Sequence, residues 1–243
     1  MKDNKSNIIS TGNEKMDKLL GGGFKRKEIN IVASRPADGK TLFLFDIAKF
    51  IANKEGLNVY YIHTDAFDKK VLKCENNLHY EAVNLNVFSD YYSILSNKIK
   101  NNNLDVIIID SLNRGSNPWV EPDESQFYFL SKLAKEHNIA IIVSNELNRN
   151  MFRRKTKEQK IDDLRIFGNF REFVNNIILI KSRYADLVSI SPTQCEHTKR
   201  TVEVYNSNNK KVGQFETKID FNGYIVDDLY MKYEDAMKIL QDN

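Results

Sequence analysis

Residues 29–41, with the sequence INIVASRPADGKT, constrain the fold of this chain more than any other stretch. A run of mostly apolar, β-branched residues leads into SRPADGKT, and apolar residues then recur at helical spacing from residue 42 to residue 51. A buried strand, a short loop and a helix that begins with Gly-Lys-Thr are typical of a phosphate-binding loop. The stretch therefore predicts a strand–loop–helix unit that binds the phosphates of a nucleotide.

The chemistry of this loop suits a nucleotide bound together with Mg²⁺. Backbone N–H groups of the loop and of the helix N-terminus point at one place and favour an anion there. The ammonium of Lys40 can reach β- and γ-phosphates, and the hydroxyl of Thr41 can ligate Mg²⁺. Ser34 replaces the first glycine of the usual GxxxxGK[ST] pattern, and the simpler interpretation is that Gly39 only forms a turn. The expected nucleotide-binding residues are Ser34, Arg35, Pro36, Ala37, Asp38, Gly39, Lys40, Thr41 and Leu42.

Two further apolar segments lead to carboxylates. Residues 104–109 run into Asp110, whose oxygen atoms suit Mg²⁺ or a water bound to it. Residues 58–62 run towards Asp65, which is well placed to orient or deprotonate a water. Asp65 could equally cap the next helix, with Asp68 as an alternative cap.

Strands that alternate with helices predict an α/β fold with a mainly parallel central sheet and helices on both faces. Ligands bind at the C-terminal ends of such strands, so residues 34–41, Asp65, Asp110 and Glu146 should converge on one site. Residues 201–205 and 214–221 alternate enough to form a C-terminal antiparallel extension. We also expect strands at residues 83–88 and 139–144, and helices at residues 91–99, 126–137, 170–176 and 230–240.

Composition places the chain among globular proteins. It has 243 residues, of which 41% are hydrophobic and 28% are charged. Residues 1–10 are polar and predict a flexible lead-in, and residues 11–243 predict a single domain. Because no run of about eighteen apolar residues occurs, we expect no membrane span. Residues 1–10 also lack the apolar core of a signal peptide, so we expect a cytoplasmic protein.

The segment 149–165 is the most basic part of the chain, with seven basic and three acidic residues. Its middle lacks apolar periodicity, which favours a loop, and its charges could contact the phosphate backbone of a nucleic acid. The alternative is a solvated charged face. The residues expected to contact DNA here are Arg149, Arg153, Arg154, Lys155, Lys157 and Arg165.

The order of these motifs resembles the RecA-like ATPase domain of DnaB-type replicative helicases over residues 11–225. Thr11-Gly12, together with Asp17, is similar to that family's TGxxxLD motif. SRPADGKT at residues 34–41 is similar to its ARPxxGKT motif, and IIIDSLN at residues 107–113 is similar to its VIDYLQ motif. NELNR resembles its SQLNR, and DLR with the following Gly168 resembles its SDLRxSG. These motifs are spread over nearly the whole chain and occur in the order of the family.

The resemblance implies a RecA-like P-loop NTPase fold, ATP with Mg²⁺, a homo-oligomeric ring or filament, and single-stranded DNA held in part by Arg165 and Gly168. It also implies that Lys40, Asp65 and Glu146 act in ATP hydrolysis. Asp65 stands in place of the family's catalytic glutamate, and Glu146 in place of its phosphate-sensing glutamine. Asn206 and Asn208 occupy the positions of its lysine and arginine finger.

Three hypotheses for the function follow. The first is a DNA-stimulated ATPase of the DnaB-like helicase type that acts on single-stranded DNA in replication or repair. The replacements at the catalytic positions favour a second, a nucleotide-binding but hydrolysis-deficient DNA-binding or regulatory subunit. The third, suggested by LLGGGF at residues 19–24, is a recombination mediator or switch ATPase similar to RecA or KaiC.

Overall fold

The computed structural model describes residues 6–35, 38–63, 77–82, 88–112, 122–148, 153–156, 158–181 and 198–219. Most of its strands are β3 (Ile29–Ser34), β4 (Val59–His63), β5 (Leu78–Ala82), β6 (Val106–Asp110), β7 (Ala140–Glu146), β8 (Asn176–Lys181), β9 (Thr198–Asn206) and β10 (Lys211–Ile219). They form one sheet in the order β10-β9-β8-β3-β7-β6-β4-β5. Neighbours from β5 to β8 are parallel, whereas β9 is antiparallel to β8 and β10. The mainly parallel sheet with an antiparallel C-terminal extension is therefore confirmed.

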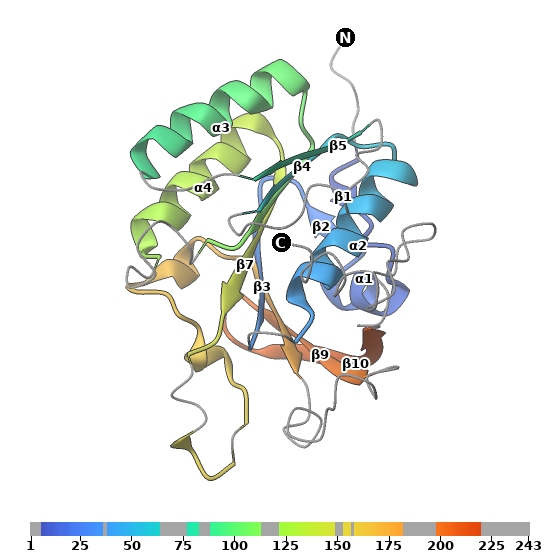
Figure 1. Ribbon diagram of the computed structural model, residues 1–243, viewed down its shortest axis with the longest axis vertical. Helices are drawn as coiled ribbons and strands as arrows, with labels where there is room; N and C mark the ends of the chain where they lie inside the picture. Colours follow the sequence, from blue (N-terminus) through green and yellow to red (C-terminus); the bar gives the residue numbers. More distant parts are fainter. Residues whose placement is uncertain are drawn as a thin grey trace, which may run out of the picture.

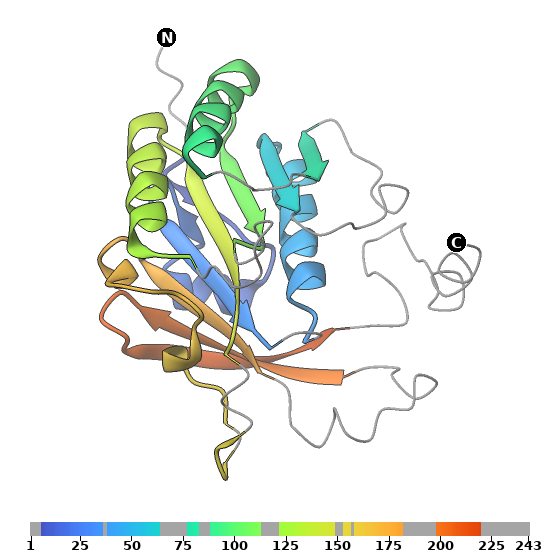
Figure 2. The ribbon, with the colours of Figure 1, turned by 60° about the vertical axis from the view of Figure 1, so that its left-hand side comes forward.

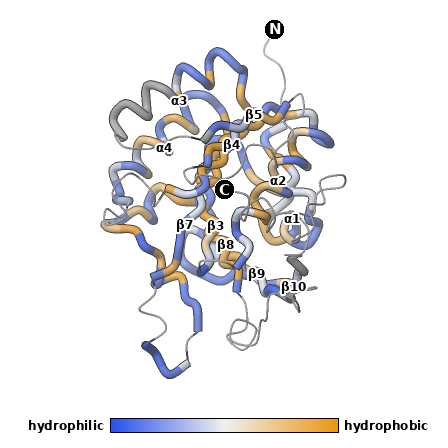
Figure 3. Tube along the Cα trace, viewed as in Figure 1, coloured by the Kyte–Doolittle hydropathy of each residue, from blue (hydrophilic) through white to orange (hydrophobic). Residues whose placement is uncertain are grey.

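Helices cover both faces of this sheet (Figures 1 and 2). One face packs against α1 (Glu14–Leu20) and α2 (Lys40–Asn53), and the other against α3 (Phe88–Asn102) and α4 (Glu124–His137). Side chains of a strand alternate between the faces, so Val32 joins the first core and Ile31 the second. Because both faces are covered, the central strands are apolar and are largely orange in Figure 3. Among the described helices, none is both long and apolar enough to cross a bilayer.

The first strand of the structure, β1, begins at Ile8, before the expected start of the domain at residue 11. β1 (Ile8–Ile9) pairs antiparallel with β2 (Phe24–Lys25), and the side chain of Ile9 is fully buried in the first core. Gly23 permits this pairing, because a Cβ at its φ of 138° would lie 2.2 Å from the carbonyl oxygen of Ile9. The side chain of Ile9 is thus part of the core although several residues around it in the sequence are polar.

Several expected elements differ in extent. The helices expected at residues 91–99 and 126–137 are present as α3 and α4, and both begin earlier. The strand expected at residues 83–88 is wrong at Phe88, which starts α3, and residues 83–87 lie outside the described part. The helix expected at residues 170–176 is a single 3-10 turn, η4 (Phe170–Glu172). Asn175 already pairs with β3 through a hydrogen bond from its N–H to the carbonyl oxygen of Ile29 at 2.8 Å. The helix expected at residues 230–240 lies outside the described residues.

A buried ion pair joins the N-terminal ends of the central strands. The guanidinium of Arg26 lies 2.8 Å from a carboxylate oxygen of Asp105, and both side chains are almost fully buried. Arg26 also donates to the carbonyl oxygen atoms of Ser6 and Asn138, at 2.8 and 3.1 Å. The second oxygen of Asp105 accepts the N–H of Asn58 at 3.0 Å. This pair therefore connects the segments that precede β4, β6 and β7. It lies at the N-terminal ends of these strands, whereas the phosphate loop follows the C-terminal end of β3.

Asp105→Ala should lower the free energy of unfolding by about 3–5 kcal/mol, because it leaves the buried guanidinium of Arg26 without its carboxylate. Urea unfolding followed by circular dichroism measures the change. Lys132→Ala, which breaks the exposed Lys132–Glu136 pair at 3.8 Å, is the matched control and should lower it by at most about 1 kcal/mol. Equal decreases in the free energy of unfolding of the two variants would show that burial does not make the Arg26–Asp105 pair more important for stability than an exposed pair.

Candidate functional site

The loop between β3 and α2 leaves the start of a long helix available to an anion. β3 ends at Ser34, and α2 begins at Lys40 directly after Gly39, whose φ of 88° is left-handed. Within the described part of the chain, no side chain caps the N-terminus of α2, and the first turn of this helix holds no acidic residue. The N–H groups of this turn are therefore available for a phosphate. Among the described residues, no ion-pair partner of Lys40 is found. Pro36 and Ala37, two of the nine expected nucleotide-binding residues, lie outside the described part.

Asp38, in the middle of this loop, is completely buried and is surrounded by donors from three parts of the chain. Its carboxylate lies 3.1 Å from Nε of Arg35, which is 2% exposed. Gln159 donates to the same carboxylate at 3.3 Å, and Arg200 donates to the backbone carbonyl oxygen of Asp38 at 3.2 Å. The sequence does not reveal these last two partners, because they lie 121 and 162 residues away. Arg35 and Asp38 therefore form a buried ion pair between two residues of the loop itself.

Asp110, the expected Mg²⁺ ligand, sits at the end of β6 with only 2% of its surface exposed. Its two oxygen atoms accept hydrogen bonds from the hydroxyl groups of Tyr61 at 2.8 Å and Ser144 at 2.6 Å. Nε2 of His63 lies 3.7 Å from the same carboxylate. Burial raises the pKa of Tyr61 well above its ordinary value, and the neighbouring charge of Asp110 adds to the effect. Tyr61 is therefore a neutral donor that fixes the orientation of the carboxylate.

Tyr61 also connects Asp110 with the phosphate loop. Its hydroxyl, which donates to Asp110, also lies 3.5 Å from the backbone carbonyl oxygen of Thr41. The two expected Mg²⁺ ligands therefore lie near the same hydroxyl group, at the same end of the parallel strands. A hydroxyl and a carboxylate are oxygen ligands of the kind that Mg²⁺ prefers, so the residue types at these two positions suit a magnesium ion. Tyr61 itself had no motif to indicate it.

Glu146 ends β7 beside the phosphate loop. β7 and β3 are parallel neighbours, with Glu146 opposite Ser34, and the side chain of Glu146 is 13% exposed. Its carboxylate lies 4.0 Å from the guanidinium of Arg165. The backbone of Arg165 is held there as well, because its N–H donates to Oδ1 of Asn145 at 3.1 Å. Glu146, which is expected to act in ATP hydrolysis, and Arg165, which is expected to contact DNA, are thus neighbours. Asp65, the expected catalytic base, lies outside the described residues.

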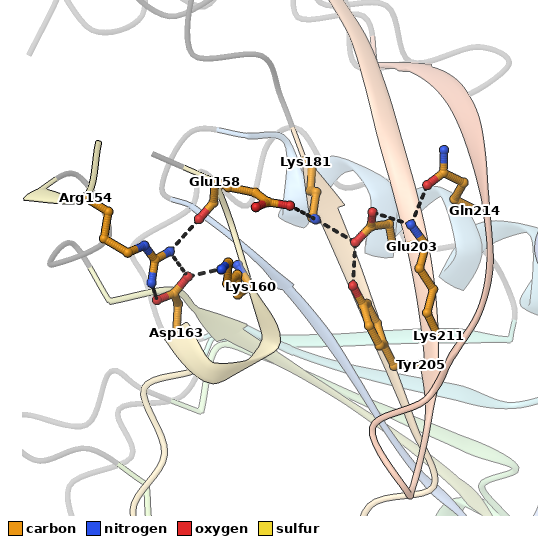
Figure 4. A network of polar contacts seen from close by, with 9 residues as sticks. All are labelled: Arg154, Glu158, Lys160, Asp163, Lys181, Glu203, Tyr205, Lys211 and Gln214. Atoms are coloured by element: carbon orange, nitrogen blue, oxygen red, sulfur yellow. Dashed lines mark hydrogen bonds and ion pairs between the residues drawn. The ribbon is translucent and has the colours of Figure 1, made fainter. Parts of the chain in front are cut away.

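Arg154 of the basic segment is bound by oxygen atoms of the same segment (Figure 4). Arg154 binds both carboxylate oxygens of Asp163, each at 2.6 Å, and donates to the carbonyl oxygen of Glu158. Hydrogen bonding to Asp163 raises the pKa of Arg154 further. Arg153 and Lys155 are exposed on a hydrophilic part of the chain that projects below the sheet in Figures 1 and 3. Arg149 and Lys157 lie outside the described residues.

The polar network of Figure 4 continues onto strands β8 to β10 through Glu158, whose carboxylate lies 4.0 Å from the ammonium group of Lys181. Glu203, which is 6% exposed, lies 2.6 Å from the ammonium groups of both Lys181 and Lys211. Tyr205 donates to the same carboxylate at 2.7 Å. Burial alone would raise the pKa of Glu203, but the hydrogen bonds from these three side chains lower it below its ordinary value. Lys211 is thus engaged within its own chain.

The hairpin between β9 and β10 contains the two asparagines expected at the positions of the lysine and the arginine finger. Oδ1 of Asn206 accepts the N–H groups of Asn208 at 3.1 Å and Lys210 at 3.0 Å. Asn206 therefore closes the turn of the hairpin. This local hydrogen bonding is typical of asparagine in a turn and differs from the role of a cation.

Comparisons with known proteins agree with this architecture. The model of the family "DnaB-like helicase C terminal domain" matches residues 8–89. The replicative DNA helicase DnaB of Geobacillus stearothermophilus is 24% identical over 204 residues, which cover 68% of this chain and 45% of that protein. The DNA repair and recombination protein RadB of Pyrococcus abyssi is 27% identical over 206 residues, covering 72% and 86%. The chain thus spans less than half the length of the DnaB helicase that it matches.

Solved structures extend the likeness to the fold. The structure of a DnaB-like replicative helicase superposes with a TM-score of 0.63 at 17% identity, over 89% of this chain and 62% of that one. The RadB recombinase superposes with a TM-score of 0.61, also at 17% identity, over 86% and 94%. At this identity the likeness concerns the fold, which is RecA-like. The expected fold class is confirmed by these comparisons and by the strand order.

Glu203→Gln should lower the free energy of unfolding by about 1–3 kcal/mol near neutral pH, because the negative charge that the ammonium groups of Lys181 and Lys211 bind is removed. A carboxyl whose pKa is lowered on folding contributes stability that is present above its ordinary value of 4.5 and is lost as the pH falls through the lowered value. The difference between parent and variant should therefore shrink below about pH 4.5. Urea unfolding at several pH values measures it, and a difference independent of pH would contradict an ionised Glu203.

Proposed function

We propose that this chain, which has a RecA-like fold and matches the model of the DnaB-like helicase C terminal domain over residues 8–89, binds ATP with Mg²⁺ and hydrolyses it in response to single-stranded DNA. The observation that carries the proposal is the position of the Tyr61 hydroxyl, which lies 2.8 Å from the carboxylate of Asp110 and 3.5 Å from the backbone carbonyl oxygen of Thr41 in the first turn of α2. Lys40 would contact the β- and γ-phosphates. Thr41 and Asp110 would hold the Mg²⁺, which supplies positive charge to the phosphates when bound.

The roles of the remaining groups follow from their positions. Asp65 comes two residues after the end of β4 and would orient the attacking water. Glu146 would face the γ-phosphate, where its negative charge is unfavourable unless a cation offsets it. Arg165, whose guanidinium lies 4.0 Å from the carboxylate of Glu146, is a cation that could do so. We propose that Arg165 and Gly168 also contact single-stranded DNA, and that the subunits assemble as a ring or filament.

A hydrolysis-deficient subunit is the second candidate, and the surroundings of the β9–β10 hairpin favour it. Hydrolysis in related assemblies needs a cation from a neighbouring subunit, whose loss lowers the rate by about 10³–10⁵. Here Asn206 closes the hairpin turn, Lys211 is paired with Glu203, and Arg200 is buried against its own phosphate loop. A recombination mediator is a third candidate, supported by the coverage of 86% of the Pyrococcus RadB protein.

ATP turnover with and without single-stranded DNA separates the first two candidates. We expect DNA-stimulated hydrolysis that Lys40→Ala lowers by at least about 100-fold, because the positive charge at the phosphates is lost. Lys54→Ala, at the C-terminal end of the same helix, is the matched control and should keep the parent rate. Binding of a fluorescent ATP analogue without turnover in the parent would contradict hydrolysis and support the second candidate.

Binding to single-stranded DNA should distinguish the exposed from the paired cations of the basic segment. Arg153→Gln and Lys155→Gln should each reduce the slope of log affinity against log salt by about 0.7, because each loses a phosphate contact. Arg154→Gln is the internal control and should change the slope less, since its guanidinium is bound by Asp163. Fluorescence anisotropy at several salt concentrations measures the slopes. Equal slopes in the parent and all three variants would mean that the segment is only a solvated loop.

A further inference from the structure

Phe167 is the most exposed of the large apolar side chains in the described residues, at 62%. A single exposed apolar residue is common on protein surfaces and by itself indicates nothing. Phe167 differs in its location, because it lies between Arg165 and Gly168, the two residues that we propose to contact DNA. No sequence motif indicates it, since the family pattern has no aromatic residue between the arginine and the glycine.

The backbone on both sides of Phe167 is fixed to the body of the domain. The N–H of Phe167 donates to the carbonyl oxygen of Pro122 at 2.8 Å. Two residues earlier, Arg165 is bound to Asn145, and two residues later the N–H of Asn169 donates to the carboxylate of Glu124 at 2.7 Å. These three attachments hold the short loop 165–169 against β7 and the start of α4. The ring of Phe167 is therefore presented to solvent by a rigid support.

Gly168 makes the attachment on the C-terminal side possible. Its φ of 75° is left-handed, and a Cβ there would lie 2.9 Å from a carboxylate oxygen of Glu124. A side chain at this position would be strained and would push against Glu124. The glycine therefore allows the loop to lie close to α4, which leaves the neighbouring aromatic ring facing outward.

The charges around Phe167 indicate what the ring can bind. Arg165 is cationic and 28% exposed, whereas Asp123 and Glu124 are acidic and come from the start of α4. Asp123 caps α4 by accepting the N–H of Ser125 at 3.0 Å, and Glu124 accepts the N–H of Asn169. A phosphate would be repelled by these carboxylates but attracted by Arg165. A neutral planar group fits beside the ring itself.

We propose that Phe167 is a stacking platform for an unpaired nucleobase, with the phosphate of the bound strand towards Arg165. The inference rests on the proposed binding of single-stranded DNA and adds a base contact to the phosphate contacts. Stacking of a base on an aromatic side chain is tolerant of sequence, because every base has a π-face. It also makes no ionic contact, so it contributes affinity that does not change with salt.

The test measures the binding of oligothymidylate and of an abasic oligomer of equal length by fluorescence anisotropy. Phe167→Ala should weaken binding of oligothymidylate by about 5- to 150-fold, leave the salt slope unchanged and have little effect on the abasic oligomer. Phe167→Trp should restore the affinity, and its fluorescence should be quenched by oligothymidylate more than that of the parent. Tyr128→Ala, which removes a half-exposed aromatic ring from α4, is the matched control and should bind as the parent does.

The outcomes separate this inference from the proposed function. If the parent binds oligothymidylate and Phe167→Ala binds it equally well, base stacking is wrong while DNA binding stands. A loss for both oligomers, or a change in the mass of the assembly by light scattering, would mean that Phe167 has a structural role and would also overturn the inference. If the parent binds neither oligomer, the proposed DNA binding fails and the inference fails with it.

Discussion

Asp38 is a charged side chain with no exposed surface, and the shape of the phosphate loop depends on how that charge is compensated. A buried carboxylate is strongly unfavourable unless ion pairs and hydrogen bonds replace its hydration. Arg35 supplies a charge from within the loop, and Gln159 supplies a donor from the basic segment. Arg200 adds a contact to the backbone of Asp38 from β9. The geometry of the loop that leads into α2 is thus held in place by segments distant in the sequence.

The same region brings together residues with different expected roles. Glu146 and Arg165 are neighbours at the end of β7, and Gln159 belongs to the segment that carries the exposed cations Arg153 and Lys155. Side chains in direct contact therefore connect the phosphate loop with the basic segment. Such contacts are a physical basis for coupling between the two sites, provided that the region has two arrangements with different affinities.

The sequence predicted the features that depend on local pattern. The apolar strands are recognisable because both faces of the sheet are covered, and the loop between β3 and α2 is recognisable because its residues are contiguous. Long-range contacts could not be predicted, since no pattern connects Asp38 with Arg200 or Asp110 with Tyr61. Composition also could not show which cations of the basic segment are paired, as Arg154 is with Asp163. The short helix expected after Phe170 was lost to pairing of the chain with β3.

The position of Arg200 has a practical consequence for work with fragments of this chain. The family match at residues 8–89 contains β3, α2 and the loop between them. A fragment with these bounds would therefore keep all nine residues that are expected to bind the nucleotide. It would lack β7 and β8, the two strands that flank β3, and also β9, which carries Arg200. Asp38 would then be without two of its three partners and β3 would have open edges. A nucleotide-binding fragment must therefore extend at least through β9, and a truncated motif that fails to bind says nothing about the intact domain.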